Sequence, residues 1–164
     1  MDRHIFEQLR RLRGQKTIIV GVGNVLKGDD GAGPLLCEQL RCTGIGAELI
    51  DAGTVPENYI QPIVKKAPQN LLIIDALDFG APAGTINIFK PEQLSSVVTS
   101  THTLSPRLFT EMVRQHIDVG VYFVGIQPAQ TRLGQSVSEP ISQAIQQLAQ
   151  TLVKTFPPKK EPRP

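Results

Sequence analysis

The chain has 164 residues, of which 40% are hydrophobic and 20% are charged, and its formal net charge at pH 7 is +2. That length suits a single domain with one core, and so small a net charge gives no general signal for nucleic-acid binding. No apolar run approaches the length of a bilayer span, and charged residues open the N-terminus where a signal peptide would be apolar. The composition therefore favours a globular protein that binds neither nucleic acid nor membranes.

The hydrophobic pattern predicts strands that alternate with helices. Residues 2–13 have the spacing of an amphipathic helix with a basic face, and we expect residues 1–15 to be an extension of a domain that spans 16–156. The proline-rich, charged residues 157–164 are expected to be a disordered tail. Strands are predicted at 17–21, 47–51, 71–74, 85–89 and 121–124, and helices at 33–41, 57–66, 106–117 and 139–156.

These elements predict a three-layer α/β/α single domain. Uniformly apolar strands suit a sheet that is covered by helices on both faces. Residues 85–89 follow a short Gly/Pro loop with no helix before it, so we expect this strand to pair antiparallel. The predicted sheet is therefore twisted, mostly parallel but mixed, with about five strands.

A glycine-rich turn with two adjacent acids, Asp29 and Asp30, follows the first predicted strand. A strand, such a turn and a helix often bind a nucleotide, but Gly21, Gly23 and Gly28 do not have the G-x-G-x-x-G spacing. The two acids would also repel a pyrophosphate at the helix start. The turn therefore favours a metal site or an acid–base site over a phosphate site.

Further polar residues follow other strands. Asp75 closes the third strand, Asp78 comes three residues later, and His102 lies in a Thr/Ser-rich loop over 99–103. Loops at the carboxyl ends of parallel strands meet at one edge of the sheet, where two carboxylates and an imidazole would suit a divalent transition ion. Taken singly, each Asp is most often a cap or turn residue. The spacing alone does not choose Asp30 over Asp29, or Asp75 over Asp78.

The two cysteines carry little functional signal. Cys37 and Cys42 lie five residues apart around the end of one predicted helix, which is a poor disulfide pair and an incomplete metal motif. Because the two cysteines are not expected to form a disulfide, a reducing, cytoplasmic setting is the simpler interpretation. Cys37 has apolar neighbours and is expected in the core.

The glycine-rich turn has the pattern G-x-G-N-x-L-x-x-D-D-G-x-G over residues 21–33, and further motifs follow it in fixed order at 51–58, 72–80, 99–102, 123–128 and 138–141. Together these motifs resemble the [NiFe]-hydrogenase maturation proteases, in the branch that serves the formate-hydrogenlyase hydrogenase (hydrogenase 3). The resemblance covers about residues 16–153.

The resemblance implies an endopeptidase, of a kind sometimes classed as aspartic, that removes a C-terminal extension from the hydrogenase large-subunit precursor after nickel insertion. The metal-contacting and catalytic residues of the family fall on Asp30, Asp75 and His102, while Asp29 is expected to be a turn or cap residue. The preferred interpretation is that the nickel belongs to the substrate, in a site that zinc or cadmium could also occupy. A monomer is expected.

Two other mechanisms stay open at this point. An intrinsic zinc-like ion could activate water, or Asp30 and Asp75 could share a proton as an acid–base dyad. An alternative of another class is a non-catalytic nickel-binding chaperone for hydrogenase assembly, which would use the same three side chains without breaking a peptide bond.

Overall fold

The computed structural model describes residues 2–97 and 105–158 of the chain. His102 and the rest of its Thr/Ser-rich loop lie outside the described residues, as does the predicted disordered tail from residue 159 onward. Within the described residues, no helix is long and apolar enough to cross a membrane.

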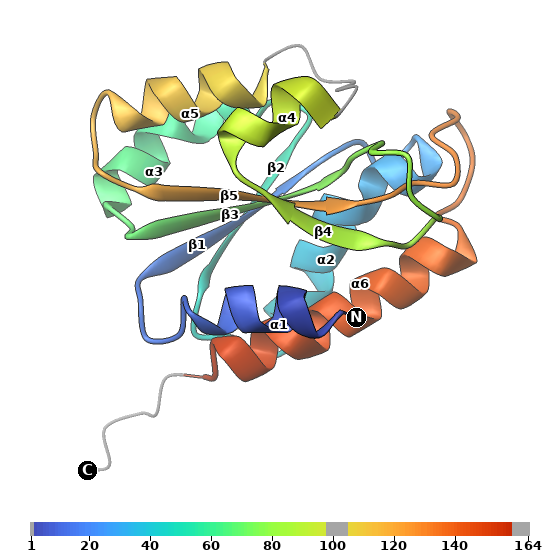
Figure 1. Ribbon diagram of the computed structural model, residues 1–164, viewed down its shortest axis with the longest axis horizontal. Coiled ribbons are helices and arrows are strands. Elements are labelled where there is room, and N and C mark those ends of the chain that lie inside the picture. Colours follow the sequence, from blue (N-terminus) through green and yellow to red (C-terminus); the bar gives the residue numbers. More distant parts are fainter. Residues whose placement is uncertain (1, 98–104, 159–164) are drawn as a thin grey trace.

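A five-stranded mixed sheet forms the middle layer (Figure 1), which confirms the predicted fold. Its strand order is β2-β1-β3-β5-β4. Strands β2, β1, β3 and β5 run parallel to one another. Strand β4 pairs antiparallel with β5, as was expected because no helix precedes β4. The strands are β1 (Thr17–Val22), β2 (Glu48–Gly53), β3 (Asn70–Ala76), β4 (Ile86–Phe89) and β5 (Gly120–Ile126).

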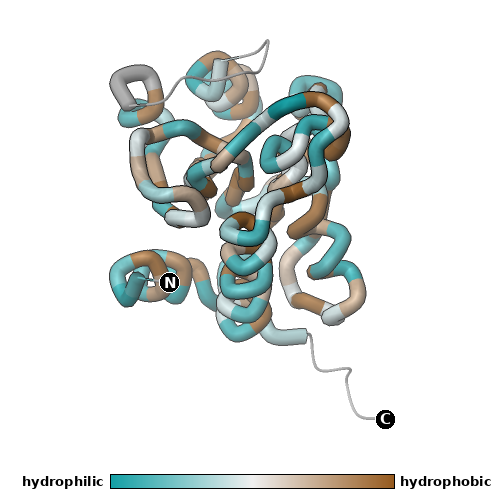
Figure 2. The backbone as a smooth tube through the Cα atoms, turned by 90° about the vertical axis from the view of Figure 1, so that its right-hand side faces the viewer, coloured by the Kyte–Doolittle hydropathy of each residue, from teal (hydrophilic) through white to brown (hydrophobic). Residues whose placement is uncertain are grey.

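Helices cover both faces of the sheet because alternate strand residues point to opposite sides. In β1, Ile19 lies in one core cluster with the helices α1, α2 and α6, whereas Ile18 and Val20 lie in a second cluster with α3, α4 and α5. Figure 2 shows the layers from the carboxyl edge of the parallel strands. The helices are α1 (Arg3–Arg10), α2 (Ala32–Arg41), α3 (Ile60–Lys66), α4 (Pro91–Val97), α5 (Pro106–Arg114) and α6 (Glu139–Thr155).

Several boundaries differ from the sequence prediction by a few residues. The helix expected from residue 57 begins as a 3-10 helix, η2 (Pro56–Tyr59), before α3. The helix expected to reach residue 117 ends at Arg114, with Gln115 as its C-cap. Asp75 lies within β3, paired in register with Gly125 of β5, and does not close the strand. Its backbone is therefore held on the β5 side by the sheet.

The N-terminal helix α1 packs on the body of the protein. Its apolar residues Ile5 and Leu9, with Leu12 just after it, are buried in the same cluster as the inner face of α6. Asp2 caps its first turn, since the carboxylate accepts the backbone N–H of His4 at 2.9 Å.

Strand β4 forms one outer edge of the sheet. The side chain of Asn87 bends back along this strand, and its Oδ1 accepts the backbone N–H of Ile88 at 2.9 Å. That N–H is therefore satisfied from within its own strand.

Candidate functional site

The loop after β1 turns back sharply on itself. Gly23 has a φ of +139°, and a Cβ atom there would lie 1.8 Å from the carbonyl oxygen of Asp30. Only glycine fits so close an approach. Residues 24–30 therefore form a tight loop, which ends in the short 3-10 helix η1 (Gly28–Gly31).

Asp30 is buried in this loop, with 4% of its surface exposed. Its Oδ2 accepts the backbone N–H of Asn24 at 3.0 Å, and its own N–H donates to the carbonyl of Lys27 at 3.2 Å. Within the described part of the chain, Oδ1 of Asp30 accepts no hydrogen bond. The carboxylate is therefore fixed by one oxygen and offers the other to a cation or a proton.

The start of α2 brings this loop against the end of β3. A Cβ atom on Gly33 would lie 2.5 Å from the carbonyl oxygen of Ile74, the residue before Asp75, and η1 itself contacts β3. Asp75 is also buried, at 4% exposure. The structure thus places Asp30 and Asp75 at the same edge of two neighbouring parallel strands, where the sequence predicted them.

The third predicted residue, His102, lies outside the described residues. Among residues 2–97 and 105–158, no three His, Cys, Asp or Glu side chains group closely enough to hold a metal ion. The convergence of Asp30, Asp75 and His102 therefore stays a prediction.

Asp29 has a different environment from its neighbour. It is fully buried, at 0% exposure. Its Oδ2 accepts the backbone N–H groups of Ala129 at 2.8 Å and Gln130 at 3.0 Å. Ser138 donates to both oxygens, with its N–H to Oδ1 at 2.6 Å and its Oγ to Oδ2 at 2.9 Å.

All four of these donors come from a segment that lies 100 to 109 residues further along the chain. Asp29 was expected to be a local turn or cap residue, but its carboxylate ties the loop after β1 to the loop after β5. Sequence reasoning missed this because nothing in the spacing of two adjacent acids says which one accepts hydrogen bonds from a distant segment.

Asp78 differs from Asp75 in its environment, because Asp78 is exposed to solvent and Asp75 is buried. Its Oδ1 accepts Nε2 of Gln127 at 2.9 Å and the N–H of Gly80 at 3.2 Å. The hydrogen bond from Gln127, followed by that from Gly80, lowers the pKa of Asp78 below its usual value.

Gln127, a buried residue at the end of β5, also holds the loop after β3. Its Oε1 accepts the N–H groups of Phe79 at 2.8 Å and Ala81 at 3.2 Å. Because both ends of this amide bind the loop, Gln127 and Asp78 have a structural role beside the buried carboxylates. Asp51 likewise makes a local turn, since its Oδ1 accepts the N–H of Gly53 at 3.2 Å.

Neither cysteine is suited to be a nucleophile at this edge. Cys37 is buried in α2, and its Sγ donates to the carbonyl of Ile50 at 3.6 Å. Burial, reinforced by the nearby Asp51 carboxylate, raises the pKa of Cys37 to about 11, so the reactive thiolate is scarce. Cys42 is exposed at the end of the same helix.

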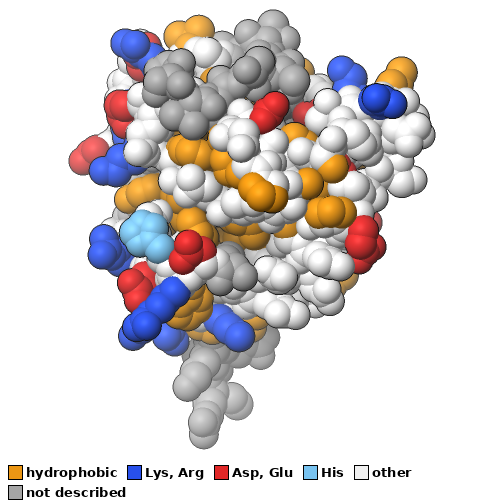
Figure 3. Space-filling model, turned by 45° about the vertical axis from the view of Figure 1, so that its right-hand side comes forward, with side chains coloured by type: hydrophobic (Ala, Val, Ile, Leu, Met, Phe, Trp, Pro, Cys, Tyr) orange, Lys and Arg blue, Asp and Glu red, His pale blue; other side chains and the backbone are white. Residues whose placement is uncertain are grey.

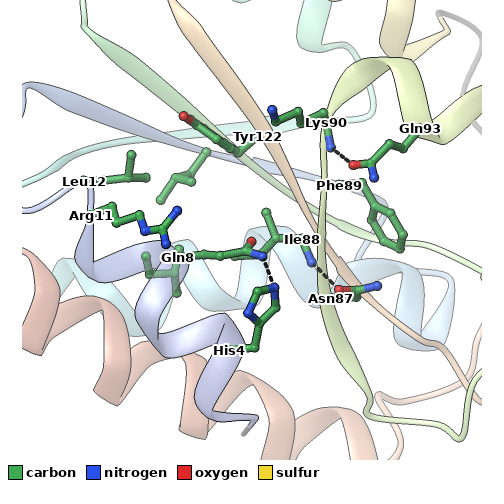
Figure 4. Close-up of a pocket in the computed structure, with 12 residues that line it drawn as sticks. His4, Gln8, Arg11, Leu12, Asn87, Ile88, Phe89, Lys90, Gln93 and Tyr122 are labelled. Carbon is green, nitrogen blue, oxygen red and sulfur yellow. Dashed lines mark hydrogen bonds between the residues drawn. The ribbon is translucent and has the colours of Figure 1, made fainter.

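A cavity of about 630 Å³ lies elsewhere, between α1 and the edge strand β4 (Figure 4). Its lining includes Gln8 of α1, Arg11 just after that helix, Lys90 after β4, and Tyr122 of β5. A hydrogen bond joins Gln8 to His4 at 2.6 Å. Asp30 and Asp75 do not line it. We place the candidate active site at the carboxylates, because the cavity has no acid among its lining residues.

Comparison with known proteins gives the class of the protein. The family model described as HycI, hydrogenase maturation protease, matches residues 36–155. The hydrogenase 3 maturation protease of Escherichia coli (strain K12) is 36% identical over 138 residues, which cover 82% of this chain and 87% of that protein.

Solved structures agree with this class. A [NiFe] hydrogenase maturation protease, HycI, from Thermococcus kodakarensis superimposes with a TM-score of 0.83 at 26% identity, over 91% of this chain and 97% of that one. The solution structure of the endopeptidase HycI from Escherichia coli gives a TM-score of 0.75 at 34% identity, over 82% and 87%.

The chain therefore belongs to the hydrogenase maturation protease family, and it is a peptidase. The resemblance that the sequence motifs indicated is confirmed.

The hydrogen bonds of Asp29 lead to a stability prediction. Because both of its oxygens accept buried donors, Asp29→Asn must place an amide N–H against at least one of them. We expect a loss of about 2 to 3 kcal/mol in the free energy of unfolding, measured by urea denaturation.

Asp78→Asn is the matched control for that variant. Both hydrogen bonds at Asp78 end on one oxygen, which the asparagine retains, and we expect the urea midpoint to stay at its wild-type value. Equal denaturation midpoints for the two variants would contradict the role given to Asp29.

The two thiols are expected to react differently with a thiol-specific reagent at pH 8. A pKa of about 11 leaves roughly one Cys37 thiol in a thousand ionised, so one thiol per native chain should react, and two after unfolding. The Cys42→Ser variant serves as the control and should show no fast-reacting thiol when native. Rapid labelling of that variant would show that Cys37 is accessible.

Proposed function

We propose that this protein removes the C-terminal extension from the large-subunit precursor of a [NiFe] hydrogenase after nickel has been inserted. Membership of the hydrogenase maturation protease family supports this proposal, as do the relatives named hydrogenase 3 maturation protease and endopeptidase HycI. We further propose that it acts in the cytoplasm as a monomer.

The observation that supports a site at Asp30 is its asymmetric environment. One oxygen accepts the Asn24 N–H, while the other accepts no hydrogen bond from the described residues. Such a carboxylate is held in place before any ligand arrives, so little ordering is needed when it binds. Asp75 belongs to the same edge and is positioned by the sheet on its β5 side.

In the proposed mechanism, Asp30, Asp75 and His102 contact nickel that is part of the substrate. Two carboxylates and one imidazole leave coordination positions open for ligands of the precursor's own metal centre. Binding of this nickel would place the scissile bond beside the carboxylates and polarise its carbonyl or an attacking water. The enzyme would thereby test whether nickel is present before it cuts.

Two rival mechanisms use the same residues. An intrinsic zinc-like ion would activate water without regard to the precursor's nickel. A dyad of Asp30 and Asp75 would share a proton and need no metal. Zinc or cadmium has ligand preferences that overlap with those of nickel, so these ions are useful probes of the site.

Substitution of the three residues is expected to abolish cleavage. In Asp30→Asn and Asp75→Asn the shape is kept but the charge is lost, and His102→Ala removes the imidazole, so we expect each to slow cleavage at least about 100-fold. Mass spectrometry of the large subunit before and after incubation measures the loss of the C-terminal peptide.

Asp78→Asn is again the control and should cleave normally, and all four proteins should unfold at similar urea concentrations. Wild-type cleavage by any of the three site variants removes that residue from the site. An unchanged mass with the wild-type protein, together with retained nickel, would instead support an assembly chaperone.

The metal dependence separates the three mechanisms. If the nickel belongs to the substrate, chelator-treated enzyme should cleave nickel-loaded precursor and leave nickel-free precursor intact. Restoration of cleavage of nickel-free precursor by added zinc would support an intrinsic ion. Equal cleavage of nickel-loaded and nickel-free precursor by chelator-treated enzyme, with no metal added, would support the acid–base dyad.

A further inference from the structure

We propose that Val25, Leu26 and Leu133 form a docking surface for the hydrogenase large-subunit precursor, which we name the loop patch. The inference rests on the proposed function and extends it, since it assigns a surface that holds the precursor body beside the cleavage site.

The loop patch is exposed although its side chains are large and apolar. Val25, Leu26 and Leu133 have 55%, 64% and 71% of their surface exposed. Leu26 and Leu133 belong to different loops, yet the loops touch, because the N–H of Gly134 donates to the carbonyl of Leu26 at 2.8 Å. Exposed apolar side chains that lie on adjoining loops are typical of protein interaction sites.

The distribution of exposed apolar residues points to one edge of the molecule. Six large hydrophobic side chains of the described residues are exposed. Besides the loop patch, two more of these exposed residues lie near the carboxyl edge of the parallel strands. Val55 follows β2, and Leu108 lies in the first turn of α5, which runs from this edge back to the start of β5. Only Phe6 of α1 lies away from this edge. Figure 3 shows hydrophobic side chains across one face of the molecule, with Lys and Arg as well as Asp and Glu around them.

The loops that carry the patch are firmly connected. Gly28 donates to the carbonyl of Gln135 at 3.1 Å, and Asp29 donates its N–H to the carbonyl of Gln130 at 3.1 Å. The buried carboxylate of Asp29 accepts four more hydrogen bonds from the same segment. Because these loops are ordered before a partner arrives, binding costs less conformational entropy.

The patch is continuous with the candidate active site. Leu26 lies on the loop whose other end is Asp30, and Asp30 holds the start of that loop through the N–H of Asn24. The N–H of Leu26 in turn donates to Oδ1 of Asn24 at 2.9 Å. A partner seated on Leu26 and Leu133 is therefore within one short loop of the carboxylate that we propose to meet its nickel.

Charges beside the patch indicate the chemistry of the partner. Lys27 and Arg132 are exposed and directly follow and precede patch residues, and neither makes an ion pair with the described residues. The complementary surface of the precursor is then an apolar area rimmed by acidic side chains.

The test compares Leu26→Ser and Leu133→Ser with the wild-type protein on nickel-loaded precursor. Each is expected to raise KM about tenfold or more, because burial of a leucine side chain is lost, with kcat changed less than twofold. Phe6→Ser, on α1, is the matched control and should leave both constants unchanged. Urea denaturation confirms that each variant is folded.

Charge provides a second measurement. Lys27→Glu and Arg132→Glu should also raise KM, and salt should raise the wild-type KM more than that of these variants, because salt screens a charge pair. Folded Leu26→Ser and Leu133→Ser proteins with wild-type KM values would overturn the loop patch.

Direct binding separates this proposal from the proposed function. The dissociation constant of the nickel-loaded precursor is measured by calorimetry for each variant, whether or not cleavage occurs. Weaker binding by the leucine variants without cleavage by the wild-type protein would support the patch and refute the peptidase role on this substrate. Cleavage by the wild-type protein, together with wild-type dissociation constants for the leucine variants, would support the peptidase role and refute the loop patch.

Discussion

The buried carboxylate of Asp29 is the contact on which the arrangement of the site depends. It closes a loop between two segments at opposite ends of the domain sequence, one after β1 and one after β5. A charged acceptor in the interior is favourable only when donors surround it, and here two backbone N–H groups converge on Oδ2 while Ser138 donates to both oxygens. The sheet makes this contact possible because only β3 lies between β1 and β5.

Two adjacent acids thereby acquire opposite roles. Asp29 has both oxygens occupied and holds the edge together, whereas Asp30 accepts a hydrogen bond from the described residues on one oxygen only. Both residues lie in the 3-10 helix η1, yet their carboxylates accept hydrogen bonds from different segments of the chain. Because Asp29 holds the loop rigidly, Asp30 is fixed without using all of its own hydrogen-bonding capacity. Polar groups that are held in place before a ligand binds are a usual basis of catalysis.

Much of the fold could be predicted from the sequence because the strands are apolar and the helix starts carry proline or polar residues. The antiparallel β4 was predictable from the short loop before it, and the placement of Asp30 and Asp75 at one edge follows from parallel strands. The exact extent of β3 was not, since Asp75 is polar and its place in register with Gly125 depends on the sheet.

The division between Asp29 and Asp30, and the part played by Gln127, depended on contacts about 50 to 100 residues away in sequence. Local patterns carry no information about such partners. The family motifs point to Asp30 and Asp75, because such motifs reflect the whole three-dimensional site at once, and this choice of acids stays a prediction.

The edge strand β4 has a further consequence for the behaviour of the protein in solution. An outer strand normally presents a row of free donors and acceptors that can template a strand from another molecule. The Asn87 amide occupies the Ile88 donor from within the chain, so a foreign strand would first have to displace it. This internal competitor lowers the tendency of the sheet to extend into aggregates during synthesis and storage.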